Sequence, residues 1–226
     1  MPIISINARP EAVQIDPTQT ALLVIDMQNA FGSPGGMFDK AGVPISSIQA
    51  AVAPTRTAVD AARRTGLPII FVKIGFRSDL ADIGADGGPN ARFLRHHGVL
   101  DGVLERDTWA TDIVEELTPG AGDIIVWKTR FSAFFRTELD ELLQRRGVTH
   151  LIVTGCTTSI CVESTVRDAF FLDYHCVVLE DCTAEPMGAT LSRSNHEATT
   201  FLFERIFGSV STSDDFCRAV ASTSPA

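Results

Sequence analysis

The 226-residue sequence lacks any apolar run approaching the roughly 18 to 20 residues that a membrane-spanning helix requires. Residues 1–10 also lack the basic segment and apolar stretch that mark a secretory signal. Basic charge is scarce as well. The formal net charge is −9, which argues against nucleic acid or an anionic membrane as a partner. We therefore expect a cytoplasmic protein that binds neither.

Paired-cysteine motifs are also missing. The five cysteines are odd in number and show no CxxC spacing, so a disulfide framework or a structural zinc site is not expected. They are Cys156, Cys161, Cys176, Cys182 and Cys217. The glycine-containing stretch 32–36 lacks the GxxxxGK[ST] order of a phosphate-binding loop. These absences argue against a disulfide framework, a structural zinc site and a phosphate-binding loop, and we expect no cofactor.

Short, continuous apolar runs recur along the chain and are typical of parallel strands buried on both faces. They occupy 21–25, 69–72, 124–127, 151–153 and 177–179, with a weaker one at 209–211. Helical segments are expected between them, at about 50–65, 111–117, 135–146, 159–173 and 189–204, followed by a short helix from Ser213.

This alternation of strands and helices predicts right-handed crossovers and a sheet covered on both faces. The expected fold is α/β, with three layers (α/β/α) and a doubly wound, mostly parallel six-stranded sheet of the Rossmann-like kind. We expect residues 1–226 to form a single domain. The long irregular stretch 75–108 reads as an insertion that serves as a lid or a subunit contact.

The segment 151–168 reads as a buried strand, a turn rich in hydroxyl side chains, and the start of a helix. Cys161 falls in the first turn of that helix, where free N–H groups and the helix dipole stabilise a thiolate. A cysteine can also serve only to fill the core, because free cysteine is among the most buried residue types. Cys161 is therefore a candidate nucleophile that needs partners.

Histidine is the usual base for a thiol nucleophile, but the five histidines are poorly placed. His150 and His175 begin strands, at the opposite edge of the sheet, and His196 falls inside a late helix. His96 and His97 lie in the insertion and remain open as alternatives.

Asp26 and Lys128 are better placed, because each ends a predicted strand at the edge where the helix of Cys161 begins. We expect their two strands to be neighbours. Lys128 would hold Cys161 as a thiolate and Asp26 as a carboxylate, or one proton would be shared among the three. Asp26 would act as acid and base, and the backbone N–H groups of Thr157 and Cys161 would face the oxyanion.

Three separated stretches carry a resemblance to a known family. They are residues 21–29, Lys128, and residues 155–165, which reads GCTTSICVEST. In this order they resemble the isochorismatase-like cysteine hydrolases over about residues 18–218. The resemblance implies a catalytic triad of Asp26, Lys128 and Cys161. It also implies a cis peptide bond between Cys156 and Thr157, and a homo-oligomer (dimer or tetramer).

Within that family, residues 161–172 and 178–181 look most like the ureidoacrylate amidohydrolases and their biuret and triuret hydrolase relatives. The nicotinamidase branch carries a metal-binding D-x-H motif where this chain has Ile74-Gly75-Phe76-Arg77, so no metal is expected. The chain is less polar than ureidoacrylate enzymes at Ile74, Phe76 and Phe131, where we align asparagine, tryptophan and tyrosine. The candidate substrate contacts are Phe31, Phe76, Arg77, Arg130 and Phe131.

The sequence therefore predicts an amidohydrolase that cleaves a C–N bond of a small ureido or carbamoyl compound through a covalent cysteine acyl-enzyme. Biuret, triuret and ureidoacrylate represent the expected type. Two alternatives stay open: a vinyl-ether hydrolase without covalent catalysis, and a catalytically silent binding module. Because the isochorismatases proper lack the nucleophilic cysteine, Cys161 argues against the first alternative.

Overall fold

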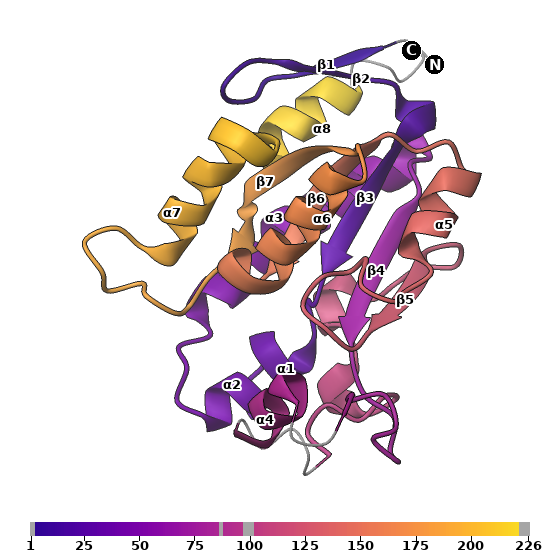
Figure 1. Ribbon diagram of the computed structural model, residues 1–226. Helices are drawn as coiled ribbons and strands as arrows, with labels where there is room; N and C mark the ends of the chain where they lie inside the picture. Colours follow the sequence, from indigo (N-terminus) through magenta and orange to yellow (C-terminus); the bar gives the residue numbers. More distant parts are fainter. Residues whose placement is uncertain (1–2, 86–87, 97–101, 222–226) are drawn as a thin grey trace.

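The computed structural model describes residues 3–85, 88–96 and 102–221. Its central sheet has six strands in the order β5-β4-β3-β6-β7-β8, and every neighbouring pair is parallel. The strands are β3 (Thr20–Ile25), β4 (Ile69–Ile74), β5 (Ile124–Lys128), β6 (His150–Cys156), β7 (His175–Ala184) and β8 (Ser209–Ser211). The predicted three-layer α/β fold is confirmed (Figure 1).

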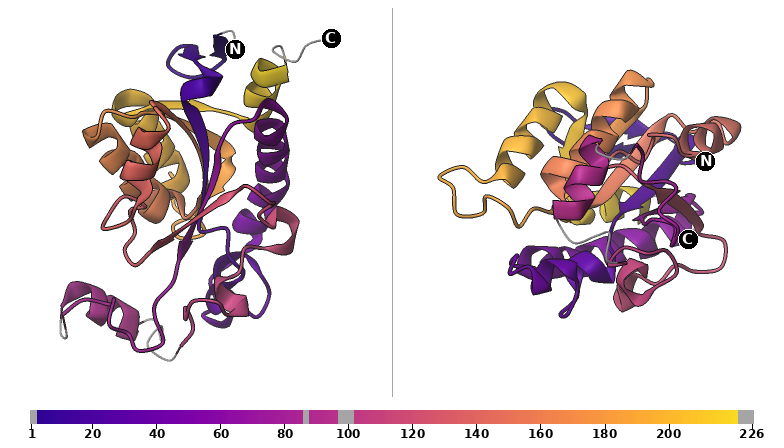
Figure 2. Two further views of the ribbon diagram at one scale, coloured as in Figure 1. Left: turned by 90° about the vertical axis from the view of Figure 1, so that its right-hand side faces the viewer. Right: turned by 60° about the horizontal axis from the view of Figure 1, so that its bottom comes forward.

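Helices cover both faces of the sheet, as the left view of Figure 2 shows. One layer contains α5 (Leu139–Arg145), α6 (Glu163–Phe171) and α7 (Asn195–Leu202), and the other contains α3 (Ser46–Thr65) and α8 (Ser213–Ala221). Successive side chains of β3 point to opposite faces of the sheet and so enter two hydrophobic cores. Leu22 and Val24 pack on the α3 side, and Leu23 and Ile25 pack on the α6 side. Burial on both faces explains why this strand is continuously apolar.

Three short helices lie at the carboxyl ends of β3 and β4, at the bottom of Figure 1. They are α1 (Asn29–Gly32), α2 (Met37–Lys40) and α4 (Pro89–His96). The helix α4 belongs to the predicted insertion 75–108, of which residues 86–87 and 97–101, including His97, lie outside the described part of the chain. The insertion therefore lies at the sheet edge that is expected to carry the active site.

The insertion is tied to the sheet close to both of its ends. Phe76 donates its N–H to the carbonyl of Leu104 at 2.9 Å and accepts the N–H of Arg106 at 2.9 Å. The guanidinium of Arg106 lies 5.2 Å from the ring centre of Trp127 on β5. These contacts hold the segment that follows α4 against β4 and β5.

Several predicted helices differ from the observed ones for local reasons. The segment 111–117 is not a helix, because Val114 donates its N–H to the carbonyl of Met27 at 3.0 Å, and Ile113 pairs with Gln28. Two 3₁₀ turns, Trp109–Thr111 and Glu115–Leu117, flank this extended part.

Local backbone geometry and capping move two other helix starts. The helix expected at 135–146 begins only at Leu139, because Arg136 adopts a positive φ of 54°. The one expected at 189–204 begins at Asn195, where Ser194 and Glu197 form a capping box. It changes to a π-helical turn over Phe203–Phe207.

Two features of the strands were not predicted. Strands β1 (Ile4–Ile6) and β2 (Val13–Ile15) form a separate antiparallel pair. The strand β7 continues to Ala184 through a register shift, well beyond the predicted 177–179. The prediction that the strands of Asp26 and Lys128 are neighbours was wrong, because β4 lies between β3 and β5.

Candidate active site

Asp26 follows the last residue of β3 and turns the chain away from the sheet. Its φ of 51° lies in the left-handed region, which aspartate tolerates better than most residues. The turn is held by the Gln28 side chain, whose amide donates to the carbonyl of Ile74 at 2.9 Å and accepts the N–H of Ile74 at 2.8 Å. Gln28 is fully buried, so the ends of β3 and β4 are locked together beneath Asp26.

Gly155 brings β6 unusually close to β3 beside this turn. Its φ is 122°, and a Cβ atom there would lie 2.0 Å from the carbonyl oxygen of Ile25. No side chain fits in that space, which explains the glycine in the sequence motif. The next residue, Cys156, donates its thiol hydrogen to the backbone carbonyl of Asp26 at 3.1 Å. The peptide bond between Cys156 and Thr157 is cis, as the family resemblance implied.

Cys161 lies in a π-helical turn, Thr158–Val162, rather than in the first turn of an ordinary α-helix. The carbonyl of Thr157 accepts the N–H groups of Ile160 at 3.1 Å and Val162 at 3.2 Å, on either side of Cys161. Such widened turns are frequent at functional sites. The role of the Thr157 and Cys161 N–H groups as oxyanion donors stays a prediction.

The structure brings the three predicted catalytic side chains together. Nζ of Lys128 lies 2.7 Å from Oδ2 of Asp26 and 3.3 Å from Sγ of Cys161. The lysine comes from β5, so its long side chain crosses the end of β4 to reach them. Asp26 and Lys128 are each 1% exposed, and Cys161 is 8% exposed. The cluster is therefore almost completely shielded from solvent.

Burial governs the protonation of this cluster. It raises the pKa of the Asp26 carboxyl more than the Lys128 ammonium lowers it. Burial alone lowers the pKa of Lys128, but the adjacent Asp26 and Cys161 more than offset this effect, and its pKa is raised. Burial, reinforced by Asp26 and opposed by Lys128, raises the pKa of the Cys161 thiol well above its ordinary value.

From the sequence, two schemes were open: a preformed Cys161 thiolate, or one proton redistributed among Asp26, Lys128 and Cys161. These pKa directions favour the second scheme. The raised pKa values of Cys161 and Lys128 favour a neutral thiol beside a charged ammonium over a thiolate formed in advance. The carboxylate of Asp26, whose raised pKa makes it a stronger base, is placed to take the thiol proton when the sulfur attacks. The thiol proton thus passes between Cys161 and Asp26 during the reaction.

The raised pKa of Cys161 predicts slow alkylation that accelerates with pH. Because only the thiolate reacts, we expect the rate of Cys161 modification by iodoacetamide to rise about tenfold per pH unit up to about pH 9. Mass spectrometry of the peptide that contains Cys161 measures this rate. A rate that is already constant at about pH 7 would show a thiolate in the resting enzyme and contradict the assignment.

Two side chains from outside the triad hold the turn that carries Cys161. Oε2 of Glu185 accepts the N–H of Ser159 at 3.0 Å and its hydroxyl at 2.5 Å, and Oε1 accepts the N–H of Met187 at 3.0 Å. Nδ1 of His196 lies 2.9 Å from Oγ1 of Thr158. Sequence analysis missed Glu185, and it placed His196 away from the site, because neither residue lies near the motif along the chain.

Replacing Glu185 by glutamine is expected to loosen the turn without touching the reacting groups. The amide retains one acceptor oxygen in place of two, so one of the two partly buried N–H···O bonds, from Ser159 or Met187, is lost. We expect the free energy of unfolding to fall by about 1 to 3 kcal/mol and kcat to fall more than KM changes. Ser159→Ala, which keeps the backbone N–H bond to Glu185, is the milder control. Equal kcat values for Glu185→Gln and the wild type would contradict this positioning role.

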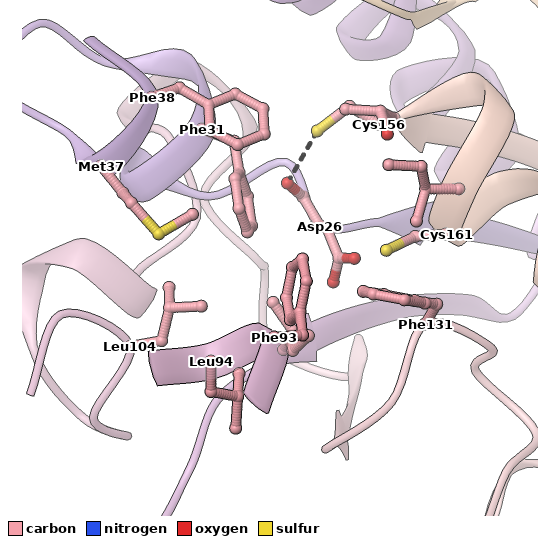
Figure 3. A pocket seen from close by; sticks show the side chains of 13 residues that line it. Asp26, Phe31, Met37, Phe38, Phe93, Leu94, Leu104, Phe131, Cys156 and Cys161 are labelled. Carbon is pink, nitrogen blue, oxygen red and sulfur yellow. Dashed lines mark hydrogen bonds between the residues drawn. The ribbon is translucent and has the colours of Figure 1, made fainter. Parts of the chain in front are cut away.

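A cavity, partly open to solvent, lies against the triad. Figure 3 shows the carboxylate of Asp26 and the sulfur of Cys161 surrounded by aromatic and aliphatic side chains. Its lining consists of Asp26, Phe31, Met37, Phe38, Ile74, Phe93, Leu94, Leu104, Phe131, Cys156, Thr157, Ile160 and Cys161. The insertion contributes Phe93, Leu94 and Leu104, which sequence analysis did not single out.

The predicted substrate contacts divide into two groups. Phe31 and Phe131 line the cavity, whereas Phe76, Arg77 and Arg130 are not among its lining residues. Phe76 is 1% exposed and packs in the core beneath the insertion. The structure does not bring these three side chains to the cavity, because each contacts the loop in which it lies.

The two arginines are engaged elsewhere. Arg77 pairs with Asp79, its Nη2 lying 2.6 Å from Oδ2. Arg130 donates to the carbonyl oxygens of Thr129 at 2.6 Å and Ile83 at 3.0 Å. Both guanidinium groups therefore brace the insertion and the loop after β5.

In the described ranges, no group of three or more His, Cys, Asp and Glu side chains is arranged to hold a metal ion. Within the same ranges, no helix is both long and apolar enough to span a membrane.

A doubly wound sheet with a buried Cys-Asp-Lys cluster at its carboxyl edge defines a class of cysteine hydrolases, and comparison with known proteins agrees. The family model of the isochorismatase domain matches residues 20–215. The chain belongs to the isochorismatase family. It is an enzyme, an isochorismatase-like cysteine hydrolase.

Three solved structures illustrate the likeness. A cysteine hydrolase from Pseudomonas syringae pv. phaseolicola is 27% identical, with a TM-score of 0.81 and coverage of 98% of both chains. An isochorismatase family protein from Desulfovibrio vulgaris is 29% identical, with a TM-score of 0.73, covering 90% of this chain and 98% of that one. N-carbamoylsarcosine amidase from Thermoplasma acidophilum is 26% identical, with a TM-score of 0.68, covering 87% and 97%.

Proposed function

We propose that the protein hydrolyses a C–N bond of a small amide, carbamoyl or ureido compound through a covalent cysteine acyl-enzyme. The observation that carries this proposal is the contact of one buried ammonium, Nζ of Lys128, with both Asp26 and Cys161. A similar chain from Thermoplasma acidophilum is an N-carbamoylsarcosine amidase, which supports carbamoyl chemistry. The likeness of residues 161–172 to ureidoacrylate, biuret and triuret hydrolases supports it as well.

Acylation follows from the positions of the three side chains. Sγ of Cys161 attacks the carbonyl carbon while its proton passes to Asp26, and the carbonyl oxygen becomes an oxyanion. The N–H groups of Thr157 and Cys161 are proposed to stabilise that oxyanion. The C–N bond then breaks, Asp26 returns the proton to the leaving nitrogen, and ammonia or an amine departs from a thioester.

Deacylation again uses Asp26 to accept and return a proton, with water as the nucleophile. Water attacks the thioester carbon as Asp26 takes one of its protons. The C–S bond breaks, the proton goes back to the sulfur, and an acid or a carbamate is released. Lys128 stays protonated throughout and balances the negative charge that Asp26 carries before each attack and regains when the C–N or C–S bond breaks.

The test is amine and ammonia release by the purified protein from a panel of simple amides, N-carbamoyl amines, biuret, triuret and ureidoacrylate. At least one member should give turnover that disappears when Cys161 is replaced. Turnover of a vinyl ether with no release of nitrogen would favour the non-covalent alternative. No turnover and no acylated protein with any compound would favour a binding module.

Assembly is part of the same proposal. We propose a homo-oligomer, a dimer or a tetramer, with the insertion 75–108 acting as a lid or a subunit contact. Exposed apolar side chains at the end of α6 are available for such packing: Phe170, Phe171 and Leu172. Sedimentation velocity distinguishes a monomer from either oligomer.

A further inference from the structure

The cavity beside the triad is apolar beyond the reacting groups. Next to the sulfur of Cys161 it is walled by the rings of Phe93 and Phe131, whose centres lie 5.2 Å apart, edge to face. A second edge-to-face pair, Phe31 and Phe38, has its ring centres 5.0 Å apart. Met37, Leu94 and Leu104 complete this part of the wall, and we call these seven side chains the apolar chamber. Figure 3 shows these side chains lining the pocket, with Phe31, Phe93 and Phe131 bordering the Asp26 carboxylate.

No cationic side chain of the described residues lines this cavity. The nearest candidates from the sequence, Arg77 and Arg130, are held by Asp79 and by backbone carbonyls. Lys128 already balances Asp26 at 2.7 Å. A carboxylate on the substrate would therefore enter the cavity without a positive partner.

The physical consequence is a strong selection by charge. Moving an ionised group from water into an apolar site is costly unless it is paired, whereas each buried methylene contributes favourably. The one acidic side chain in the lining, Asp26, would also repel an anionic substrate. The chamber favours a neutral molecule whose non-reacting part is hydrocarbon.

We infer that the substrate is a neutral amide or carbamoyl compound that carries an apolar group, aliphatic or aromatic, and not an anionic ureido acid. The reacting carbonyl lies at Cys161, and the apolar group occupies the chamber between Phe31, Phe93 and Leu104. This inference rests on the proposed function and narrows its substrate class. The aromatic pairs suit a flat ring, which packs well edge to face against phenylalanine.

Matched substrate pairs test the inference. The first pair is hexanamide and adipic acid monoamide, and the second is benzylurea and its para-carboxy derivative. Each pair differs only by an added or substituted carboxylate far from the reacting carbonyl. We expect kcat/KM for nitrogen release to be about 100-fold higher for the neutral member of at least one pair. Equal or faster turnover of the anionic members would overturn the inference while leaving the proposed function intact.

A cationic side chain at the rim of the cavity is expected to reverse the preference for neutral substrates. Phe93 is 37% exposed, so an arginine there can keep its charge near solvent while reaching the chamber. We expect Phe93→Arg to lower kcat/KM for the neutral members and to raise it about tenfold for the anionic ones. Ile206→Arg, which places the same charge at a position 55% exposed and outside the cavity lining, is the control and should alter neither. An unchanged preference in Phe93→Arg would contradict the role of the chamber.

If none of the four compounds turns over, binding measurements test the substrate class separately from the proposed reaction. Calorimetry with the Cys161→Ala protein then measures affinity without chemistry. Tighter binding of the neutral members would support the chamber and count against the proposed reaction. Tighter binding of the anionic members, or no binding of any member, would overturn the inference.

Discussion

Replacing Cys161 by serine is expected to lower kcat by about 10⁴-fold or more on any substrate that the wild type turns over. The hydroxyl of serine has a far higher pKa than a thiol, and Asp26 is too weak a base to activate it. The substitution changes one atom in a residue that is 8% exposed, so the folded structure should persist. Steady-state nitrogen release measures the loss, and circular dichroism checks the fold.

The control for Cys161→Ser is the same change at Cys217. That thiol is half-buried and faces the carbonyl of Thr57 on α3, away from the cavity. Cys217→Ser should retain wild-type kcat. If Cys161→Ser also retained near wild-type turnover, covalent catalysis by this residue would be excluded.

Replacing Lys128 by methionine is expected to damage both stability and activity. The change leaves the Asp26 carboxylate buried without its counter-charge, which typically costs about 3 to 5 kcal/mol of the free energy of unfolding. The loss of the ammonium also removes the charge that supports proton transfer, so kcat should fall by about 10²-fold to 10³-fold. Urea unfolding and steady-state kinetics measure the two effects.

The stability loss in Lys128→Met should depend on pH in a defined direction. Burial already raises the pKa of Asp26 above its ordinary 3.8, and removal of Lys128 raises it further. A carboxyl whose pKa is higher in the folded state favours folding below its unfolded pKa, and this contribution is lost as the pH rises through the folded pKa. The destabilisation should therefore be smallest in acid and grow towards neutral pH.

Two further variants make this prediction specific. Asp26→Asn combined with Lys128→Met removes both charges, and it should be more stable at neutral pH than Lys128→Met alone. Arg145→Met breaks the exposed pair with Glu141 and should cost less than about 1 kcal/mol. A loss in Lys128→Met that is equally large at all pH values would contradict an uncompensated Asp26.

The sheet and the triad could be predicted from the sequence because their signals are local. Runs such as 21–25 are apolar throughout since both faces of β3 are buried. Asp26 and Lys128 each follow or end such a run, and all strands of a parallel sheet end at the same edge. The order of the strands carries no comparable signal, and β4 was not expected between β3 and β5.

The missed parts of the site depend on contacts between distant segments. Glu185 lies beyond β7 yet holds the N–H of Ser159, a separation of 26 residues. The chamber takes Leu94 and Leu104 from the insertion, where nothing in the local pattern indicates which side chains turn inward. The arginines Arg77 and Arg130 were chosen for their charge, and their carboxylate and carbonyl partners become visible only once the loops are folded.

The protonation state of Cys161 also could not be predicted from the sequence. Position after a strand and at the start of a helix predicted a stabilised thiolate. In the structure the thiol is almost fully buried, and burial outweighs the nearby ammonium, so its pKa is raised. The sequence indicated the partners of Cys161 but not the depth at which they meet.

Covalent catalysis by Cys161 is the central claim, and intact-protein mass spectrometry after rapid acid quench tests it most directly. With a substrate that is turned over, the wild type should gain the mass of the acyl group during steady state, and peptide mapping should place that mass on Cys161. Cys161→Ser should gain no such mass, and Cys217→Ser should behave as the wild type. Turnover by the wild type with no acylated protein at any quench time, or acylation at another residue, would contradict the account.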